Sequence, residues 1–237
     1  MKDMNRQHLE KSIQATIDNG MRLLDEAELL KDWEKYPTAL ALSILAQEEF
    51  SKAFLIYLVK EKMVPWSVEI RRALTDHICK QLLGLILGYI TPSDEDFKKI
   101  IERLKKKNYS NRELERRVAD AINVFRHEKI RRWEDQKWWW DEDPQYEINV
   151  KKIFHGSLEK RKQNAIYVRV NKQGQVSSRP VQISKDTVDI ELAKASNFNY
   201  AVKNIIVSDK NKDTNISEIL ALIKIAFEKN GFITENF

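Results

Sequence analysis

The chain has 237 residues, of which only 6 are glycine and 5 are proline. Sheet-rich domains need both residues at their many turns, so this scarcity argues against a β-sandwich or a barrel and favours a few long helices. Apolar residues make up 42% of the sequence, which is enough for a core and too much for a disordered chain. The single Cys79 excludes a disulfide framework and no secretory signal is visible, so we expect a cytoplasmic protein.

The net charge of +5 is concentrated in two blocks in the middle of the chain. Residues 98–137 hold 14 Lys and Arg against 7 Asp and Glu, and residues 151–185 hold 9 against 1. Blocks of this kind attract polyanions such as RNA, or an acidic protein partner. They are equally typical of a helical surface that is simply well solvated.

Hydrophobic spacing and the prolines predict a series of helices, because proline is tolerated in the first turn of a helix and seldom inside one. The expected helices in the first part of the chain cover residues 5–32, 38–63, 66–90, 94–107 and 110–138.

The pattern changes after residue 140. Ile166, Val168 and Val170 alternate with polar residues and a turn at residues 171–174 follows, which predicts a β-hairpin. Two further helices are expected over residues 186–207 and 215–229.

The expected fold is therefore mainly α, a bundle of about six or seven helices with a small β-hairpin insertion near 165–180. We divide it into a bundle core over residues 1–140, a hairpin and loop insert over 141–185, and C-terminal helices over 186–237 that pack on the same domain.

The second predicted helix has a polar cluster inside an apolar stretch. Residues 39–59 have the length of a membrane span, but Gln47, Glu48, Glu49 and Lys52 lie at its centre. Each charge there would cost roughly 3 kcal/mol in a bilayer. A buried bundle helix, with no membrane contact, is the better interpretation, and it requires partners for these charges.

Counting residues across Pro65 predicts the partners, because a tight helical hairpin there would place the second and third helices antiparallel. Lys52 lies 13 residues before Pro65 and His77 lies 12 after it, while Glu49 lies 16 before and Lys80 lies 15 after. At a rise of about 1.5 Å per residue, Glu49 would face Lys80 and Lys52 would be level with His77. The candidate catalytic residues are His77, Arg72, Lys80, Glu48, Glu49 and Lys52.

Several kinds of site are compatible with this cluster. It can be a buried ion-pair network that fixes helix register, or part of a protein-binding surface. It can also be a phosphodiester site in which His77 moves protons and lysines balance phosphate charge. We expect no metal and no cofactor, because the paired Glu-x-x-His motifs of di-iron bundles are missing and the two lysines would repel a cation.

At these residues the sequence resembles the AbiV family of bacterial abortive-infection proteins. The resemblance rests on Ala-Leu-Ala-x-x-x-x-Ala-x-Glu-Glu-x-x-Lys at 39–52, on His77-x-x-Lys80, and on Arg161-Lys-Gln-Asn-Ala-Ile-Tyr-Val168 with Gly174 and Pro180. Ser51 and Ile166 depart from the family's usual glycine and leucine. The resemblance implies antiphage defence: an effector, acting as a homodimer, that arrests phage gene expression or translation after a phage-encoded protein triggers it.

Such families are compared with the HEPN superfamily, whose helical dimers cleave RNA without a metal ion. HEPN nucleases carry Arg, four to six residues, and then His, a spacing that Arg72 and His77 match, although Ala73 replaces the usual polar residue. This implies an alternative function as a metal-independent endoribonuclease. His77 would act on the ribose 2′-hydroxyl or the leaving group, Arg72 and Lys80 would stabilise the phosphate, and Glu48 and Glu49 would orient these cations. A third alternative is a non-catalytic interaction module built around the ion pairs.

Other features are candidates for contacts with RNA or the translation machinery, or for packing. The candidate nucleic-acid-binding residues are Arg126, Lys129, Arg131, Arg132, Lys160, Arg161 and Lys162, which otherwise form a solvated face. Three consecutive tryptophans, Trp138–Trp140, cannot all face one core, so at least one is expected at the surface or an interface. Gly84-x-x-x-Gly88 predicts close helix packing or a dimer seam.

Overall fold

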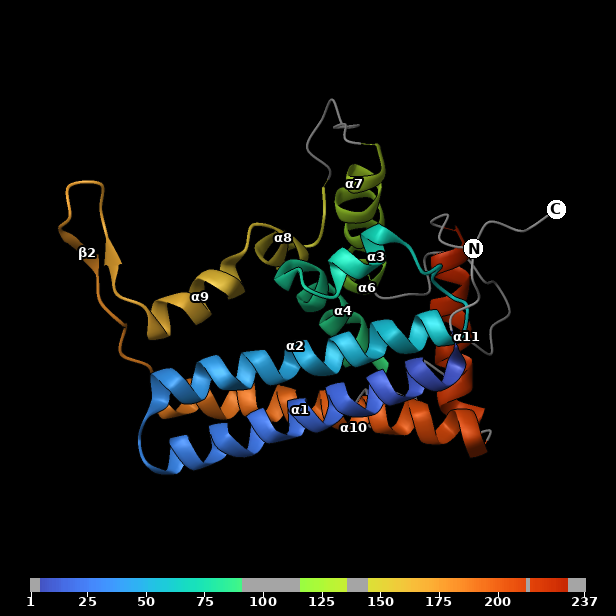
Figure 1. Ribbon diagram of the computed structural model, residues 1–237, viewed down its shortest axis with the longest axis horizontal. Helices are drawn as coiled ribbons and strands as arrows, with labels where there is room; N and C mark the ends of the chain where they lie inside the picture. The colour runs from blue at the N-terminus through green and yellow to red at the C-terminus, as the bar shows by residue number, and fades with distance from the viewer. Residues whose placement is uncertain (1–4, 91–115, 136–144, 212–213, 230–237) are drawn as a thin grey trace.

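The structure is a computed structural model that describes residues 5–90, 116–135, 145–211 and 214–229. The described chain is helical apart from one two-stranded antiparallel hairpin (Figure 1). This confirms the predicted fold class, a mainly α protein with a small hairpin.

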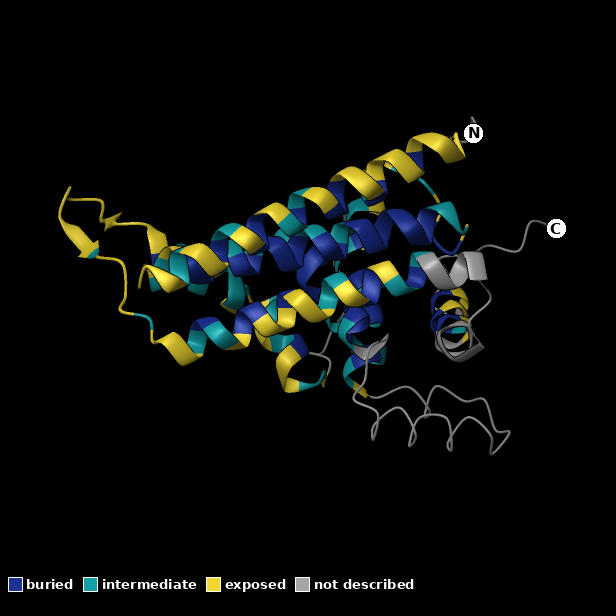
Figure 2. Ribbon diagram, turned by 90° about the horizontal axis from the view of Figure 1, so that it is seen from below, coloured by how far each residue is buried: buried dark blue, intermediate teal, exposed yellow. Residues whose placement is uncertain are grey.

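Three long helices form the body of the molecule. Helix α1 (Arg6–Asp32) and helix α10 (Lys185–Asn211) both pack against α2 (Tyr36–Lys60). Asn5 caps α1 by accepting a hydrogen bond from the Gln7 backbone N–H, and Pro37 lies in the first turn of α2, where its missing N–H is harmless. Most of α2 is buried, as Figure 2 shows. Among the residues that the structure describes, no helix has both the length and the hydropathy of a membrane span.

The helix predicted over 66–90 is interrupted, so the prediction of one continuous helix was wrong. Ser67 caps a short α3 (Val68–Ala73), and the Asp76 side chain accepts from the backbone N–H of Cys79 at 2.8 Å, which starts α4 (His77–Ile90). His77 is therefore the first residue of α4. The predicted helix at 94–107 lies outside the described residues.

The described part of the predicted helix at 110–138 is helical throughout. It consists of α6 (Arg116–Asn123), a π-helical segment η1 (Val124–Arg131) and α7 (Arg132–Asp135). Val118, Ile122 and Phe125 point into the core. Trp138–Trp140 lie outside the described residues.

Residues 148–166 form two helices that the sequence did not predict. Helix α8 (Ile148–Phe154) and helix α9 (Ser157–Ile166) are joined by Gly156, whose φ of +72° lies in the left-handed region that glycine tolerates. Helix α9 packs against α2. The predicted hairpin follows as β1 (Arg169–Val170) and β2 (Val176–Ser178), which confirms it.

The C-terminal helices complete the core. Helix α11 (Thr214–Lys229) contacts α10, α4 and α6. Gly84 allows α4 to approach α10, because a Cβ there would lie 2.8 Å from Cε2 of Phe198. Gly84 therefore serves close packing between these helices. Together α2, α4, α9 and α10 surround the candidate functional site.

Candidate functional site

Glu48 is a buried carboxylate at the centre of a cluster of polar side chains. It lies on α2 and is only 2% exposed. Its Oε2 is 3.0 Å from Nζ of Lys80 on α4, and its Oε1 is 3.1 Å from Nζ of Lys162 on α9. The Gln81 side-chain amide donates to Oε1 at 3.0 Å. One carboxylate thus joins three helices, and we call Glu48, His77, Lys80, Gln81, Glu159 and Lys162 the Glu48 cluster.

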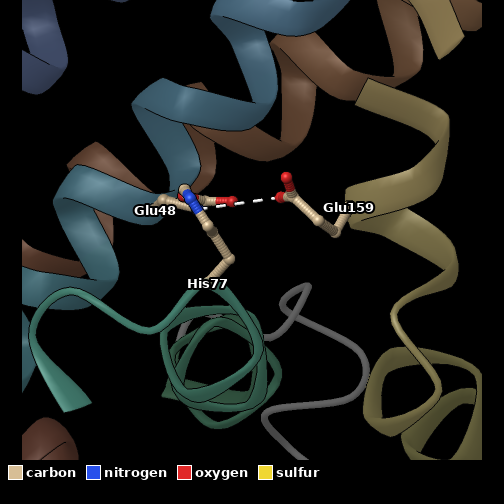
Figure 3. Close-up of side chains that lie close together, drawn as sticks. All are labelled: Glu48, His77 and Glu159. Atoms are coloured by element: carbon tan, nitrogen blue, oxygen red, sulfur yellow. Dashed lines mark hydrogen bonds and ion pairs between the residues drawn. The ribbon is translucent and has the colours of Figure 1, made fainter. Parts of the chain in front are cut away.

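His77 lies on the solvent side of this carboxylate. Its ring lies against the Glu48 carboxylate (Figure 3), with Nδ1 2.5 Å from Oε2, and 42% of its side chain is exposed. The short contact with a carboxylate oxygen places the proton on Nδ1, which donates to Glu48. Within the described part of the chain, Nε2 has no hydrogen-bond partner. The carboxylate therefore fixes the tautomer and leaves Nε2 as the nitrogen that can exchange protons.

The environment of Glu48 keeps it ionised. Burial by itself would raise the pKa of this carboxyl, but the hydrogen bond from His77 and the charges of Lys80 and Lys162 outweigh it and lower the pKa to about 2. The carboxylate is thus a permanent negative charge at neutral pH. It holds two buried ammonium groups in place and orients one imidazole ring.

Glu159 on α9 completes the cluster. Its Oε2 is 2.6 Å from Nζ of Lys162 and 3.7 Å from Nδ1 of His77. Ligand atoms of Glu48, His77 and Glu159 lie within 4.8 Å of one another, a spacing that would suit a metal ion. The Lys162 ammonium pairs with both carboxylates, at 2.6 Å from Glu159 and 3.1 Å from Glu48, and lies 3.1 Å from Nδ1 of His77, whose proton is directed at Glu48. It already supplies the positive charge that such a trio attracts.

A second buried carboxylate lies close by. Glu191 on α10 is 1% exposed, and it accepts from the Gln47 side chain at 2.9 Å, from Arg161 at 2.9 Å and from Lys194 at 3.0 Å. Burial opposes its ionisation, but these donors and charges lower its pKa below the usual value. Gln47, which donates to Glu191, is the neighbour of Glu48 on α2. The carboxylates of Glu48 and Glu191 therefore lie at the same stretch of that helix.

A pocket of about 440 Å³ lies between these two groups. Its walls come from α2, α4, α6, α8, α9 and α10, and its size suits a small molecule or a single nucleotide. Five basic side chains line it against the two carboxylates Glu48 and Glu191: Lys80, Arg117, Lys152, Arg161 and Lys194. The buried Oε1 of Gln81, which also lines the pocket, has no hydrogen-bond partner among the described residues and can accept from a donor group of an occupant. The excess of basic side chains over carboxylates in the pocket wall favours an anionic occupant.

The structure brings together only some of the predicted catalytic residues. His77, Lys80 and Glu48 meet, but Lys80 pairs with Glu48, so the predicted pairing of Glu49 with Lys80 was wrong. Glu49 pairs with Lys52 at 3.4 Å, one turn along α2. Counting residues sets height along antiparallel helices, but rotation about the helix axis, 100° per residue, decides which neighbour points inward.

Arg72 lies outside the Glu48 cluster. It is exposed on α3, with its guanidinium 4.4 Å from the centre of the Trp133 ring. This distance is typical of a cation–π contact. Residues 74–76 form a non-helical turn that separates α3 from α4. The spacing of Arg72 and His77 in the sequence therefore does not place both side chains in one cluster.

Most of the predicted nucleic-acid-binding residues have acidic partners. Arg126 pairs with Glu134, Lys129 with Asp76, Arg131 with Asp135 and Arg132 with Glu128. Arg161 pairs with Glu191, and Lys162 is buried in the Glu48 cluster. Lys160 is exposed, and among the described residues its side chain has no ion-pair partner. The role of these residues in nucleic-acid binding stays a prediction.

Sequence reasoning missed Glu159, Gln81 and Glu191, and it assigned Lys162 to a surface. The spacing of apolar residues did not predict α9. Nothing in the sequence therefore indicated that residues more than 100 positions after Glu48 would lie close to its carboxylate. The available signal was the segment Arg161–Val168, which forms part of the resemblance and begins with two residues of the site.

A comparison with known protein families identifies the family of the chain. Residues 8–199 match the model of the AbiV family, HEPN_AbiV, which covers α1 to α9, the hairpin and about half of α10. No curated protein matches the chain. No solved structure matches it. The family match covers well over half of the chain and includes the whole Glu48 cluster, so the chain belongs to the AbiV family of HEPN-like abortive-infection proteins, which act in phage defence.

Proposed function

We propose that the chain is an abortive-infection effector that, once a phage-encoded protein triggers it, arrests phage gene expression by cleaving RNA without a metal ion. His77 is the residue that moves the proton. The observation that carries the proposal is the pairing of a half-exposed imidazole with a buried, ionised carboxylate, 2.5 Å from Nδ1 of His77 to Oε2 of Glu48. This arrangement orients a general base and leaves its second nitrogen open to a substrate.

The cleavage step requires only groups that the chain and the RNA supply. Nε2 of His77 takes the proton from a ribose 2′-hydroxyl, the 2′ oxygen attacks the adjacent phosphorus, and the bond between phosphorus and the 5′ oxygen breaks. The 5′ oxygen takes a proton from water, and His77 returns its proton to solvent. The products are a 2′,3′-cyclic phosphate and a 5′-hydroxyl end.

In this proposal the basic residues of the pocket supply positive charge, with Lys80 tied to His77 because both contact Oε2 of Glu48. Lys80, Arg161 and Lys194 line the pocket, and each is held in place by Glu48 or Glu191. Cations fixed in advance stabilise the negative charge that develops on the phosphate, because they need no rearrangement during the reaction. Glu48 keeps the ring of His77 in the productive tautomer.

Substitution of His77 tests the proposal in cells. In a strain producing His77→Ala, phage should plate as they do without the protein, and RNA from infected cells should stay intact. His8→Ala is the matched control, because His8 is exposed on α1 away from the cluster. Equal protein levels are checked by immunoblot. Full protection by His77→Ala would contradict the proposal.

A second candidate is an effector that arrests translation by binding, without cleaving RNA. Two observations favour it. Lys80 and Lys162 already pair with carboxylates of the Glu48 cluster, and Arg72 lies outside that cluster. In that case Glu48 serves packing and register. Protection would then survive His77→Ala but not variants that disturb the fold.

The assembly and its place of action belong to the same proposal. We expect a homodimer in the cytoplasm, as the family resemblance implies. Sedimentation velocity of the full chain at micromolar concentration should give the mass of two chains, and the mass of one chain would contradict this expectation.

A further inference from the structure

The hairpin and its flanks project from the helical body. Figure 1 shows residues 166–181, which we call the hairpin arm, extending beyond the ends of the long helices, and Figure 2 shows that they are exposed. A projecting arm of this kind contributes little to the core, yet its composition is not that of a polar loop. The arm carries six exposed large apolar side chains: Ile166, Tyr167, Val168, Val170, Val176 and Val181.

The exposed valines form a surface that water solvates poorly. Val170 and Val176 are cross-strand partners, so they lie on the same face of the sheet, with 59% and 55% of their surfaces exposed. The two-stranded sheet also has unpaired outer edges within the described chain, and such edges accept an added strand from a partner. The arm therefore offers both backbone hydrogen bonds and apolar contact.

The chemistry of the arm identifies the class of its occupant. The arm carries Arg169, Lys172 and Arg179 and no acidic residue. Two arms would therefore repel each other, which argues against a symmetric contact with a second copy. Five of the six exposed apolar side chains are aliphatic, which suits a protein better than RNA, whose bases stack on aromatic rings.

A continuous chain of polar contacts connects the arm to His77. Arg169 on β1 donates to Oε1 of Gln163 at 3.3 Å, and the Gln163 amide donates to Oε1 of Glu159 at 2.8 Å. Glu159 pairs with Lys162, Lys162 with Glu48, and Glu48 with His77, over the distances given above. The backbone N–H of Val181 also donates to the Asn164 carbonyl at 3.0 Å, so β1 and the segment that follows β2 are both tied to the last turn of α9.

We propose that the hairpin arm is the docking surface for an acidic protein that adds an extended, apolar segment to the sheet edge, and that docking acts on His77 through Gln163 and Glu159. This rests on the proposed function in that the partner is the phage-encoded trigger. A partner that draws Arg169 toward its own carboxylates removes the contact to Gln163. Glu159 and Lys162 then readjust around Glu48, which holds the ring of His77.

Binding to the arm is tested with a defined probe, the product of the phage gene in which mutations that escape protection arise. The purified phage protein is titrated against the full chain without RNA. Val170→Asp with Val176→Asp should weaken binding at least tenfold, since it adds negative charge and removes the apolar pair. Val68→Asp is the matched control, because Val68 is 64% exposed in the first turn of α3, where an acidic residue is favourable.

The results separate this inference from the proposed function. His77→Ala should bind the phage protein as the wild type does, whether or not RNA is cleaved. Unchanged binding by the double Asp variant would overturn the docking surface, as would a phage protein with net positive charge. Loss of RNA binding rather than protein binding in that variant would also overturn it.

The coupling is tested by Gln163→Leu, which removes both hydrogen bonds of Gln163 and leaves the apolar surface of the arm unchanged. Because nothing links Arg169 to Glu159 in this variant, docking cannot change the contacts of Glu159, so the variant should bind the phage protein within twofold of the wild type but lose protection against phage. Gln14→Leu is the matched control, because Gln14 makes the same kind of contact, 2.8 Å to Asp18 one turn away, on the exposed face of α1. Full protection by Gln163→Leu would overturn the coupling.

Discussion

Glu48 and Glu49 are adjacent in the sequence but lie in different surroundings. Glu48 is buried and holds Lys80, Lys162 and His77, whereas Glu49 is partly exposed and pairs only with Lys52 among the described residues. The difference follows from the turn of 100° between successive residues of α2. One carboxylate faces the junction of α4 and α9, and its neighbour faces away from it.

Substituting each of these residues by Gln should separate their roles. Glu48→Gln removes the carboxylate that pairs with the buried Lys80 ammonium and leaves Lys162 with Glu159 alone, so the free energy of unfolding should fall by about 3–5 kcal/mol. Glu49→Gln should lower it by less than about 1 kcal/mol, because the pair with Lys52 is partly solvated. Urea denaturation followed by circular dichroism measures both. Equal losses in the two variants would contradict the role given to Glu48.

The lowered pKa of Glu48 predicts how stability depends on pH. The folded-state pKa of about 2 lies below the ordinary value of 4.5, so the folded chain binds this proton less tightly than the unfolded chain does. The stability that the Glu48 carboxylate provides is complete above pH 4.5 and is lost as the pH falls from there toward 2.

The comparison with Glu48→Gln isolates this contribution from those of Asp76 and Glu191, whose pKa values are also lowered. The gap in unfolding free energy between wild type and variant should narrow from pH 6 to pH 3, by a total on the order of 1–3 kcal/mol. Urea midpoints measured across this range provide the test. A gap independent of pH would show that Glu48 titrates normally.

At the scale of the elements, close helix packing depends on a few glycines. A Cβ at Gly20 of α1 would lie 2.7 Å from Cε1 of Phe50, a ring that is fully buried. Gly88 of α4 has more room, since its Cβ would lie 3.4 Å from Phe198. Both lie inside helices, so the two positions differ mainly in packing.

Alanine at the two glycines should therefore have opposite effects. Gly20→Ala should destabilise the chain by about 1–3 kcal/mol through overpacking against Phe50. Gly88→Ala should be neutral or stabilising by up to about 1 kcal/mol, because alanine favours the helix. Thermal unfolding of both variants measures this. If Gly20→Ala were more stable than the wild type, α1 and α2 would have to be packed less tightly than they are in the structure.

The long elements were predictable because their signals are local. Apolar spacing and the prolines located α1, α2, α10 and α11 within a few residues, and Gly174 with the alternating valines located the hairpin. Helices α8 and α9 were missed, since each is short and has mixed polarity that only packing against α2 and α4 resolves. The break before α4 depends on one side chain, Asp76, that caps the backbone of Cys79.

At the scale of the whole molecule, all but Glu128 of the five buried charged side chains in the described residues gather at one place between helices. Glu48 and Glu191 flank a pocket of about 440 Å³, and the residues that reach them come from positions as far apart as 47 and 194. The sequence placed Glu48, His77 and Lys80 in one cluster, Glu48 from the polar centre of the second predicted helix, and His77 and Lys80 from their heights along the third. It could not predict the contributions of α9 and α10, because contacts over more than 100 residues leave no trace in local spacing.

The central claim is that the imidazole oriented by Glu48 cleaves RNA without a metal ion. The most direct test incubates the purified full chain, with the phage protein defined by escape mutations, with total RNA in excess EDTA. The wild type and His8→Ala should produce fragments ending in 2′,3′-cyclic phosphate, and His77→Ala should produce at least 100-fold fewer. Fragments formed equally by His77→Ala, or no cleavage by the triggered wild type, would contradict the claim.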